Sequence, residues 1–168
     1  MDPHLQRLHD NIQSVTASLN AEELVWHPAG KWSAGEILEH LFLTYTGTIK
    51  GFSRVMQAEP VPKRQTLKQR VGAFLVLEMG HFPEGVQAPT FSRPKGAPLK
   101  TVAAEIGSKI IEMDKVMADC EAKFGARVKI LDHPLLGPFS VAQWRKFHMR
   151  HGMHHLKQIS RLRTLKAA

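Results

Sequence analysis

The chain has 168 residues, of which 43% are hydrophobic and 23% charged, with one cysteine and a net charge of +8 when histidines are neutral. This length and balance favour a globular fold with its own core, so we expect one domain over residues 1–168. No apolar run approaches the roughly 20 residues that a membrane-spanning helix needs, so we expect no membrane partner. The single Cys120 cannot form an internal disulfide, and no signal-like segment opens the chain, which favours a cytoplasmic location.

The positive charge would suit a nucleic acid, but the lysines and arginines are spread over the whole chain. The two denser stretches, residues 60–70 and 160–168, lack the interleaved aromatic side chains of a single-strand binder. We therefore interpret the charge as a solvated surface and do not expect a nucleic-acid partner.

The first expected helix covers residues 4–19, where apolar side chains recur at helical spacing. Residues 20–31 lose this period and contain Pro28 and Gly30, which predicts a loop. A second helix is expected from residue 33 to about residue 57, because Ser33 and Glu36 form the S-x-x-E pattern of a capping box.

The stretch between residues 58 and 100 is less regular. A short helix is expected over residues 67–79, followed by a proline- and glycine-rich segment over residues 80–98. Long irregular connections are often functional, and this one could cover a pocket.

Two more long helices are expected, over residues 99–124 and 140–165. The second of these begins at another capping box, formed by Ser140 and Gln143. The segment between them is expected to be a loop, with at most a short extended piece at residues 127–131. Four long helices and one connection of this length predict an all-α four-helix bundle with a long irregular crossover between helices 2 and 3.

Histidines on two of these helices suggest a metal site. His151 and His155 are four residues apart, so both imidazoles leave the last helix on one face, where they could hold a divalent metal or act as hydrogen-bonded interior histidines. His40 is the candidate third ligand, on the flank of the apolar stripe of the second helix. Thr44 and Gly47 follow on that flank, where small side chains leave a groove beside a metal or simply permit close helix packing.

Four further residues are candidates for the surroundings of this site. His154 is turned roughly 100° from His155 around the helix, so we expect it to be partly exposed or to contact a ligand. His148 lies on the inner stripe one turn earlier, where it would line the pocket or serve as a ligand. Glu36 could orient the His40 imidazole or serve only as a cap. His133, before Pro134, could approach the site or stabilise a turn.

Three segments, KWSAGEILEHL, FPEGVQAPTFSRP and HPLLGPFSVAQWRKFHMRHGMHHLKQI, together resemble the DinB-like superfamily. The resemblance is closest to the DinB branch marked by HP-x-x-G before the last helix. It implies a four-helix bundle that binds one divalent ion, commonly zinc or nickel, through three histidines. One comes from the second helix and two from an H-x-x-x-H on the last, which match His40, His151 and His155.

The resemblance also implies a class of reaction. Related members include metal-dependent transferases that act on low-molecular-weight thiols such as bacillithiol or mycothiol, which implies thiol S-transfer here. Metal-dependent hydrolysis and a non-catalytic, stress-associated bundle with a vestigial histidine site are the alternatives. No general base stands out, so no catalytic residue is assigned. Family members also self-associate, and Phe42 and Ile49 lie off the predicted inner stripe, so we expect a homodimer.

Overall fold

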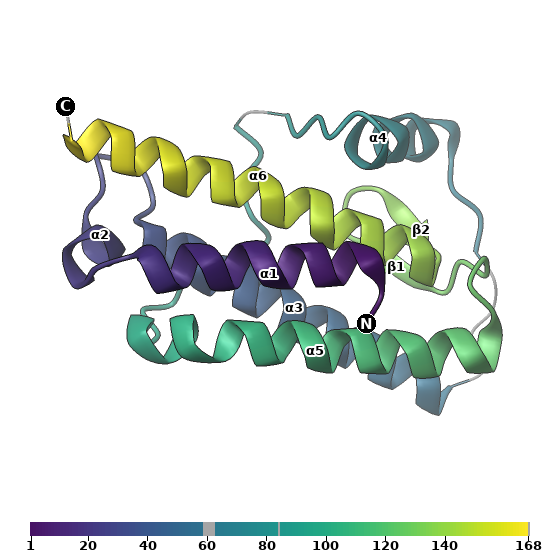
Figure 1. Cartoon of the computed structure of the whole chain (residues 1–168). Coiled ribbons are helices and arrows are strands. Elements are labelled where there is room, and N and C mark those ends of the chain that lie inside the picture. The colour runs from purple at the N-terminus through teal and green to yellow at the C-terminus, as the bar shows by residue number, and fades with distance from the viewer. Residues whose placement is uncertain (59–62, 84, 168) are drawn as a thin grey trace.

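A computed structural model of the chain describes residues 1–58, 63–83 and 85–167, and this part is mostly helical (Figure 1). The four long helices are α1 (Pro3–Ser18), α3 (Ala34–Gln57), α5 (Leu99–Phe124) and α6 (Val141–Ala167). Two short helices, α2 (Ala21–Val25) and α4 (Leu67–Leu77), a 3-10 turn η1 (Thr90–Ser92) and a small sheet complete the described ranges. The mostly helical prediction is therefore confirmed; six α-helices are found in the described ranges, where four long helices and one short helix were expected. None of the described helices combines the length and apolar character needed to cross a membrane.

The four long helices lie side by side and share one core. Helix α1 packs against α5 and α6, and α3 packs against the same two helices (Figure 1). Apolar side chains at helical spacing supply the contacts, since they form a stripe along one side of each helix. The largest fully buried side chains of this core are Leu5, Leu8, Ile12, Leu38, Leu41, Tyr45, Phe52, Ile106, Ile110, Met113, Met117 and Phe139.

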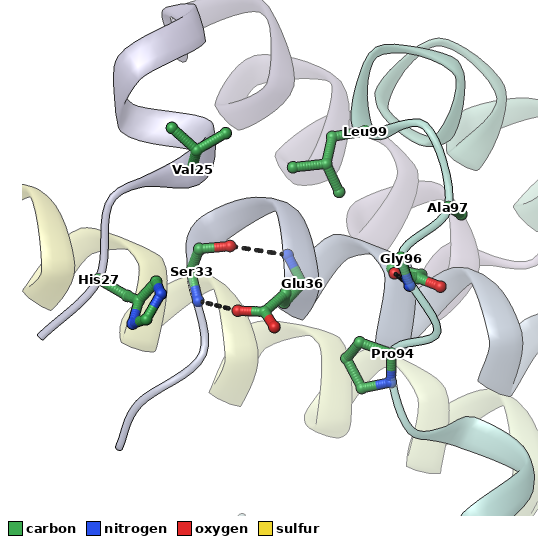
Figure 2. Close-up of a pocket in the computed structure, with 9 residues that line it drawn as sticks. Val25, His27, Ser33, Glu36, Pro94, Gly96, Ala97 and Leu99 are labelled. Atoms are coloured by element: carbon green, nitrogen blue, oxygen red, sulfur yellow. Dashed lines mark hydrogen bonds between the residues drawn. The ribbon is translucent and has the colours of Figure 1, made fainter. Parts of the chain in front are cut away.

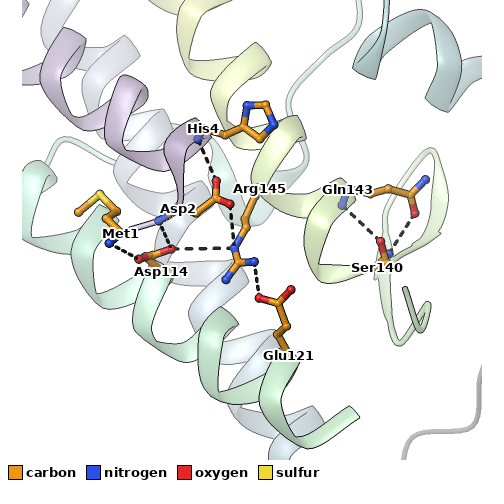
Figure 3. Close-up of polar contacts among 8 residues, drawn as sticks. All are labelled: Met1, Asp2, His4, Asp114, Glu121, Ser140, Gln143 and Arg145. Carbon is orange, nitrogen blue, oxygen red and sulfur yellow. Dashed lines mark hydrogen bonds and ion pairs between the residues drawn. The ribbon is translucent and has the colours of Figure 1, made fainter. Parts of the chain in front are cut away.

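Both predicted capping boxes are present and fix where the two site-bearing helices begin. The Ser33 N–H donates to Glu36 Oε2 at 2.8 Å, and Ser33 Oγ accepts the Glu36 N–H at 3.2 Å (Figure 2). At the start of α6, Ser140 and Gln143 exchange the equivalent bonds at 3.1 and 3.3 Å (Figure 3). These bonds satisfy N–H groups that have no partner inside the helix.

Two short elements occupy segments predicted to be loops. Helix α2 lies within residues 20–31 and is only five residues long, which is too short to show an apolar period. Strands β1 (Leu131–His133) and β2 (Gly137–Phe139) form an antiparallel hairpin within residues 125–139. At three residues each, they are too short to show the alternation by which a strand is predicted from sequence.

The crossover between α3 and α5 carries two elements that pack on the bundle. Helix α4 packs against α6, and η1 packs against α3. Arg150 of α6 fixes the end of α4, because its guanidinium donates to the carbonyls of Leu77 and Glu78 at 3.2 and 3.0 Å. The predicted helix over residues 67–79 is therefore confirmed, with its end at Leu77.

The two side chains expected to mark an outward dimer face do not do so. Ile49 is buried in the core. Phe42 is half-buried against the core, and the ammonium of Lys109 lies 5.6 Å from its ring centroid. The prediction that these two side chains point outward was wrong, because α5 covers more of the α3 surface than a single apolar stripe.

A buried arginine joins three helices at the opposite end of the bundle from the C-terminus (Figures 1 and 3). Arg145 of α6 is 8% exposed and donates to Glu121 of α5. Its Nε lies 3.8 Å from Asp2 Oδ2 and 3.9 Å from Asp114 Oδ1. Asp2 also caps α1 by accepting the His4 N–H at 2.9 Å. One guanidinium therefore sets the positions of α1, α5 and α6 along one another.

We expect Arg145→Ala to lower the free energy of unfolding by about 2 kcal/mol, less than a fully buried pair because Glu121 is a third exposed. The loss comes from leaving several carboxylates close together without their cation. Urea denaturation at neutral pH measures it. Arg161→Ala, at an exposed position of the same helix, should change the free energy by less than about 0.5 kcal/mol. Equal effects of the two substitutions would contradict the role given to Arg145.

Candidate metal centre

Helices α3 and α6 bring together the three histidines that were expected to meet. His155 Nε2 lies 3.0 Å from His151 Nε2, and His40 Nε2 lies 3.4 Å from the same nitrogen. One ring nitrogen from each residue lies within 4.8 Å of the others, in a group that could hold a metal ion. His40 and His155 are buried and His151 is partly exposed.

Hydrogen bonds at the far side of two rings determine which nitrogen carries the proton. His40 Nδ1 lies 2.7 Å from the carbonyl oxygen of Ser92, and His155 Nδ1 lies 2.8 Å from Gln158 Oε1. A carbonyl oxygen only accepts, so each Nδ1 carries the hydrogen and each Nε2 has a free lone pair. The amide NH₂ group of Gln158 donates to His154 Nε2 at 3.1 Å, and its carbonyl oxygen therefore points to His155.

This proton arrangement suits a cation better than it suits hydrogen bonding among the rings. Two Nε2 lone pairs face His151, whose single ring hydrogen can satisfy only one of them. A divalent ion would satisfy all three Nε2 atoms at once. Three imidazole nitrogens are a donor set that zinc and nickel accept, and they leave coordination positions open. The residues present therefore fit a divalent metal.

Burial keeps all three rings in the neutral form that a metal requires. Desolvation lowers the pKa of His40, although the bond to Ser92 partly opposes it. Desolvation, with the nearby His40 ring, lowers the pKa of His155 to about 3. The pKa of His151 is lowered well below its ordinary value, first by desolvation and then by the neighbouring histidines. Protons are therefore poor competitors for these nitrogens at neutral pH.

Aromatic rings line the surroundings of the three histidines. Trp32, before α3, lies 5.3 Å from the His40 ring between centroids. Phe82, from the crossover, lies 5.7 Å from the His151 ring and 4.9 Å from that of His154. Phe147 stacks on His151 at 5.2 Å. The crossover thus contributes a wall of the site, and the walls are apolar.

The neighbours predicted on α3 make bonds within their own helix. Glu36 serves as the cap of Ser33, which is the simpler of the two roles considered for it. Thr44 Oγ1 donates to the His40 carbonyl at 2.8 Å. A Cβ at Gly47 would lie 3.6 Å from the Phe91 ring, so this glycine faces an aromatic side chain. Close packing therefore accounts for Gly47.

The remaining histidines separate into distinct roles. His154 is partly exposed and is connected to His155 through Gln158. His148 is fully buried, stacks on Trp144 at 5.5 Å, and is not part of the three-histidine group. His133 Nδ1 accepts the N–H groups of two residues in the hairpin turn, both at 3.2 Å, so its role is structural.

Two hydrogen-bond partners of the three histidines were not identified from sequence. Gln158 stands in the H-x-x-H-H-x-x-Q run, at helical spacing from His155 and His154, so its position was a usable signal. Ser92 acts through its backbone carbonyl from a segment 52 residues away from His40, which no side-chain pattern reveals.

A separate hollow of about 340 Å³ lies near the start of α3, between residues that include Val25, Ser33, Glu36 and Leu99 (Figure 2). Its main polar groups are already paired. Ser33 and Glu36 bond to each other, and the carboxylate of Glu39 accepts two backbone N–H groups. These lining groups therefore have few free polar atoms to offer a ligand.

A family model described as "Protein of unknown function (DUF1569)" matches residues 1–161. The match covers nearly the whole chain, including all three histidines, so the protein belongs to this family. No curated protein and no solved structure matches the sequence.

The buried histidines should make the metal-free protein sensitive to acid. Burial lowers the pKa of His148 to about 3, below the 6.5 of an unfolded histidine, so its contribution to stability is present above pH 6.5 and is lost as pH falls. Between pH 7 and 5 the unfolded chain gains this proton and the folded protein does not, which costs about 2 kcal/mol for each such histidine.

We expect urea denaturation in the presence of a chelator to show this loss, and His148→Leu to reduce it by about one histidine's share. His81→Leu, at an exposed position, is the matched control and should leave the pH dependence unchanged. A pH dependence that is the same in the wild type and in His148→Leu would show that His148 is already protonated at neutral pH or remains accessible to protons.

Proposed function

We propose that this member of the DUF1569 family is a divalent-metal-dependent enzyme of the DinB-like superfamily that transfers the sulfur of a low-molecular-weight thiol to an electrophile. The observation that carries the proposal is the convergence of three Nε2 atoms, two of which have free lone pairs fixed by bonds at Nδ1. The packing of α1, α3, α5 and α6 supports the four-helix bundle that this superfamily implies.

The chain's own residues would hold and orient the metal. His40, His151 and His155 supply neutral nitrogens, with Ser92 and Gln158 fixing two of the rings. A divalent ion held there, zinc or nickel, lowers the pKa of a thiol or of a water molecule. In the reaction, a sulfur–carbon bond forms, the thiol proton is released and the leaving group departs from the electrophile.

Two features favour a thiol over water as the nucleophile. Hydrolytic metal sites of the H-E-x-x-H kind place a carboxylate beside the metal as a general base. Here the metal-binding group found among the described residues consists of histidines alone, and the nearby Glu36 and Glu39 are bonded to backbone N–H groups. The walls made by Trp32 and Phe82 are also apolar, which makes the site less favourable for water. Self-association as a homodimer has the resemblance alone in its favour.

Metal binding is the first test of this proposal. We expect zinc or nickel to raise the melting temperature at pH 7.5, with about 2.7 kcal/mol added when free metal is 100 times its Kd. The response should be kept at pH 6 and should decline only as the pH falls toward the lowered pKa values of the folded protein, about 3 for His155, where protons begin to compete for the rings. Differential scanning calorimetry with and without metal measures both.

Two adjacent histidines provide the matched pair for that experiment. His155→Ala removes a ligand and should abolish the metal-dependent increase. His154→Ala removes only a partner of Gln158 and should keep most of it. Equal losses from the two variants would show that the site is assigned wrongly.

Thiol binding is the second test. We expect bacillithiol to give a thiolate-to-metal charge-transfer band with the Co²⁺-loaded protein, because a thiol deprotonates when it binds such an ion. S-methyl bacillithiol has no acidic proton and should give no band. Loss of the band in His155→Ala would locate it at this site. A metal-loaded protein without the band, but with metal-dependent ester hydrolysis, would indicate the hydrolase alternative. Metal binding with neither activity would indicate a non-catalytic bundle.

A further inference from the structure

Glu39 carries a buried carboxylate and is the neighbour in sequence of a candidate metal ligand. It precedes His40 on α3 and is 1% exposed. Within the described residues it forms no ion pair with a basic side chain; instead, its two oxygens accept the backbone N–H groups of Lys95 at 2.7 Å and Gly96 at 3.2 Å. Figure 2 shows Gly96 against α3, in the segment that leads to Leu99. A buried charge satisfied by backbone N–H groups alone requires that this segment stay in place.

The segment held by Glu39 is the one that orients His40. Ser92, three residues before Lys95, is 2% exposed, and its carbonyl oxygen accepts the His40 Nδ1 hydrogen at 2.7 Å. Two consecutive residues of α3 therefore bind the same short stretch of the crossover, one through its carboxylate and the other through its imidazole. We propose that Glu39 is a positioning residue for His40, acting through the segment from Ser92 to Gly96.

The other polar bonds of this stretch shape it but do not attach it to α3. The Ser92 N–H and Oγ both donate to the Pro89 carbonyl, at 3.0 and 3.1 Å. Arg93 Nε donates to the Ala88 carbonyl at 2.9 Å. These bonds make a compact turn. Over the described residues, the polar attachment of that turn to α3 consists of the bonds from Glu39 and His40.

Apolar contacts hold the two ends of the stretch, where they allow some sliding. The Phe91 ring faces Gly47, and the Leu99 side chain lies over Gly35, where a Cβ would be 2.4 Å from it. Apolar contacts lack the direction of a hydrogen bond. Without the Glu39 carboxylate, the Ser92 carbonyl can move while the apolar contacts persist. His40 would then lose the partner that keeps its hydrogen on Nδ1 and its lone pair on Nε2.

The same contacts would also be expected if Glu39 served only to stabilise the fold. In that case, removing its charge lowers the melting temperature and leaves the His40 ring unchanged. If Glu39 positions His40, the tautomer and the proton exchange of that ring change as well. Partners of metal-bound histidines typically contribute 10–100-fold in metal affinity. The metal readout rests on the proposed function, whereas the proton readout does not.

The test compares Glu39→Gln with Glu36→Gln. Both substitutions remove one negative charge from the first turns of α3, and glutamine can replace glutamate in a capping box, so Glu36→Gln keeps the helix start. The first measurement is ¹⁵N NMR of the His40 ring in metal-free protein at pH 8, where its imidazole is neutral, with assignment from His40→Gln. The second is the Kd for Zn²⁺, from competition with a chelator.

We expect Glu39→Gln to mix the two His40 tautomers, to speed exchange of the Nδ1 hydrogen about tenfold or more, and to weaken Zn²⁺ binding about tenfold. Glu36→Gln should leave all three unchanged. If Glu39→Gln does not fold, Glu39→Asp keeps the charge but cannot reach both N–H groups, and it should change the same readouts in the same direction.

Two results would overturn the role of Glu39 or the metal site separately. A Glu39 variant that melts at a lower temperature but keeps the wild-type His40 tautomer and exchange rate shows that Glu39 is only an anchor of the crossover. A wild-type protein that binds no Zn²⁺ overturns the proposed function, while the tautomer of His40 still decides the role of Glu39.

Discussion

The two unprotonated Nε2 atoms that face His151 set the central constraint on this molecule. Buried lone pairs that point at one another cost free energy unless a hydrogen or a cation lies between them. The nitrogens of His40 and His155 are kept in this state by carbonyl oxygens on the far side of each ring. Rings held in this way are arranged for a positive charge before any is bound, which is the preorganisation that a metal site needs.

Meeting that constraint requires α3 and α6 to be placed along one another to within a fraction of a turn. A helix rises about 5.4 Å per turn, so a slip of one turn would remove the 3.0 and 3.4 Å approaches of the ring nitrogens. The two capping boxes fix where each helix begins, and Arg145 fixes α6 against α1 and α5. The polar junction at Arg145 and the histidine site are thus parts of one positioning system on the same helix.

The helices and the three histidines could be predicted because the signals for them are local. Apolar residues at helical spacing, two capping boxes and the His151/His155 spacing each lie within one or two turns of chain. Helix α2 and the β1–β2 hairpin were missed because three to five residues are too few to show a period.

The groups that orient the site were harder to predict for different reasons. Gln158 lies three residues from His155, at a spacing that the sequence shows. A glutamine at this spacing from a histidine is not specific to a metal site, however, so the signal was weak. The Ser92 carbonyl is backbone, so no residue type marks it. Glu39 stands next to His40 in the sequence, yet its carboxylate binds a segment more than 50 residues away. Contacts between the crossover and α3 arise from the tertiary fold, and a helical pattern carries no information about them.

The charge of the donor set has a consequence for what the site would accept. Three neutral imidazoles contribute no negative charge, so a divalent cation held by them keeps its full charge in an environment with apolar walls. The nearest acidic side chain in sequence, Glu39, is bonded to two backbone N–H groups and does not join the group of ligands. An anion at the open position would therefore be favoured over a neutral molecule, and a thiol that releases its proton becomes such an anion. A thiol is thus the substrate favoured by three features together: the neutral rings, the apolar walls and the bonding of Glu39 to the backbone.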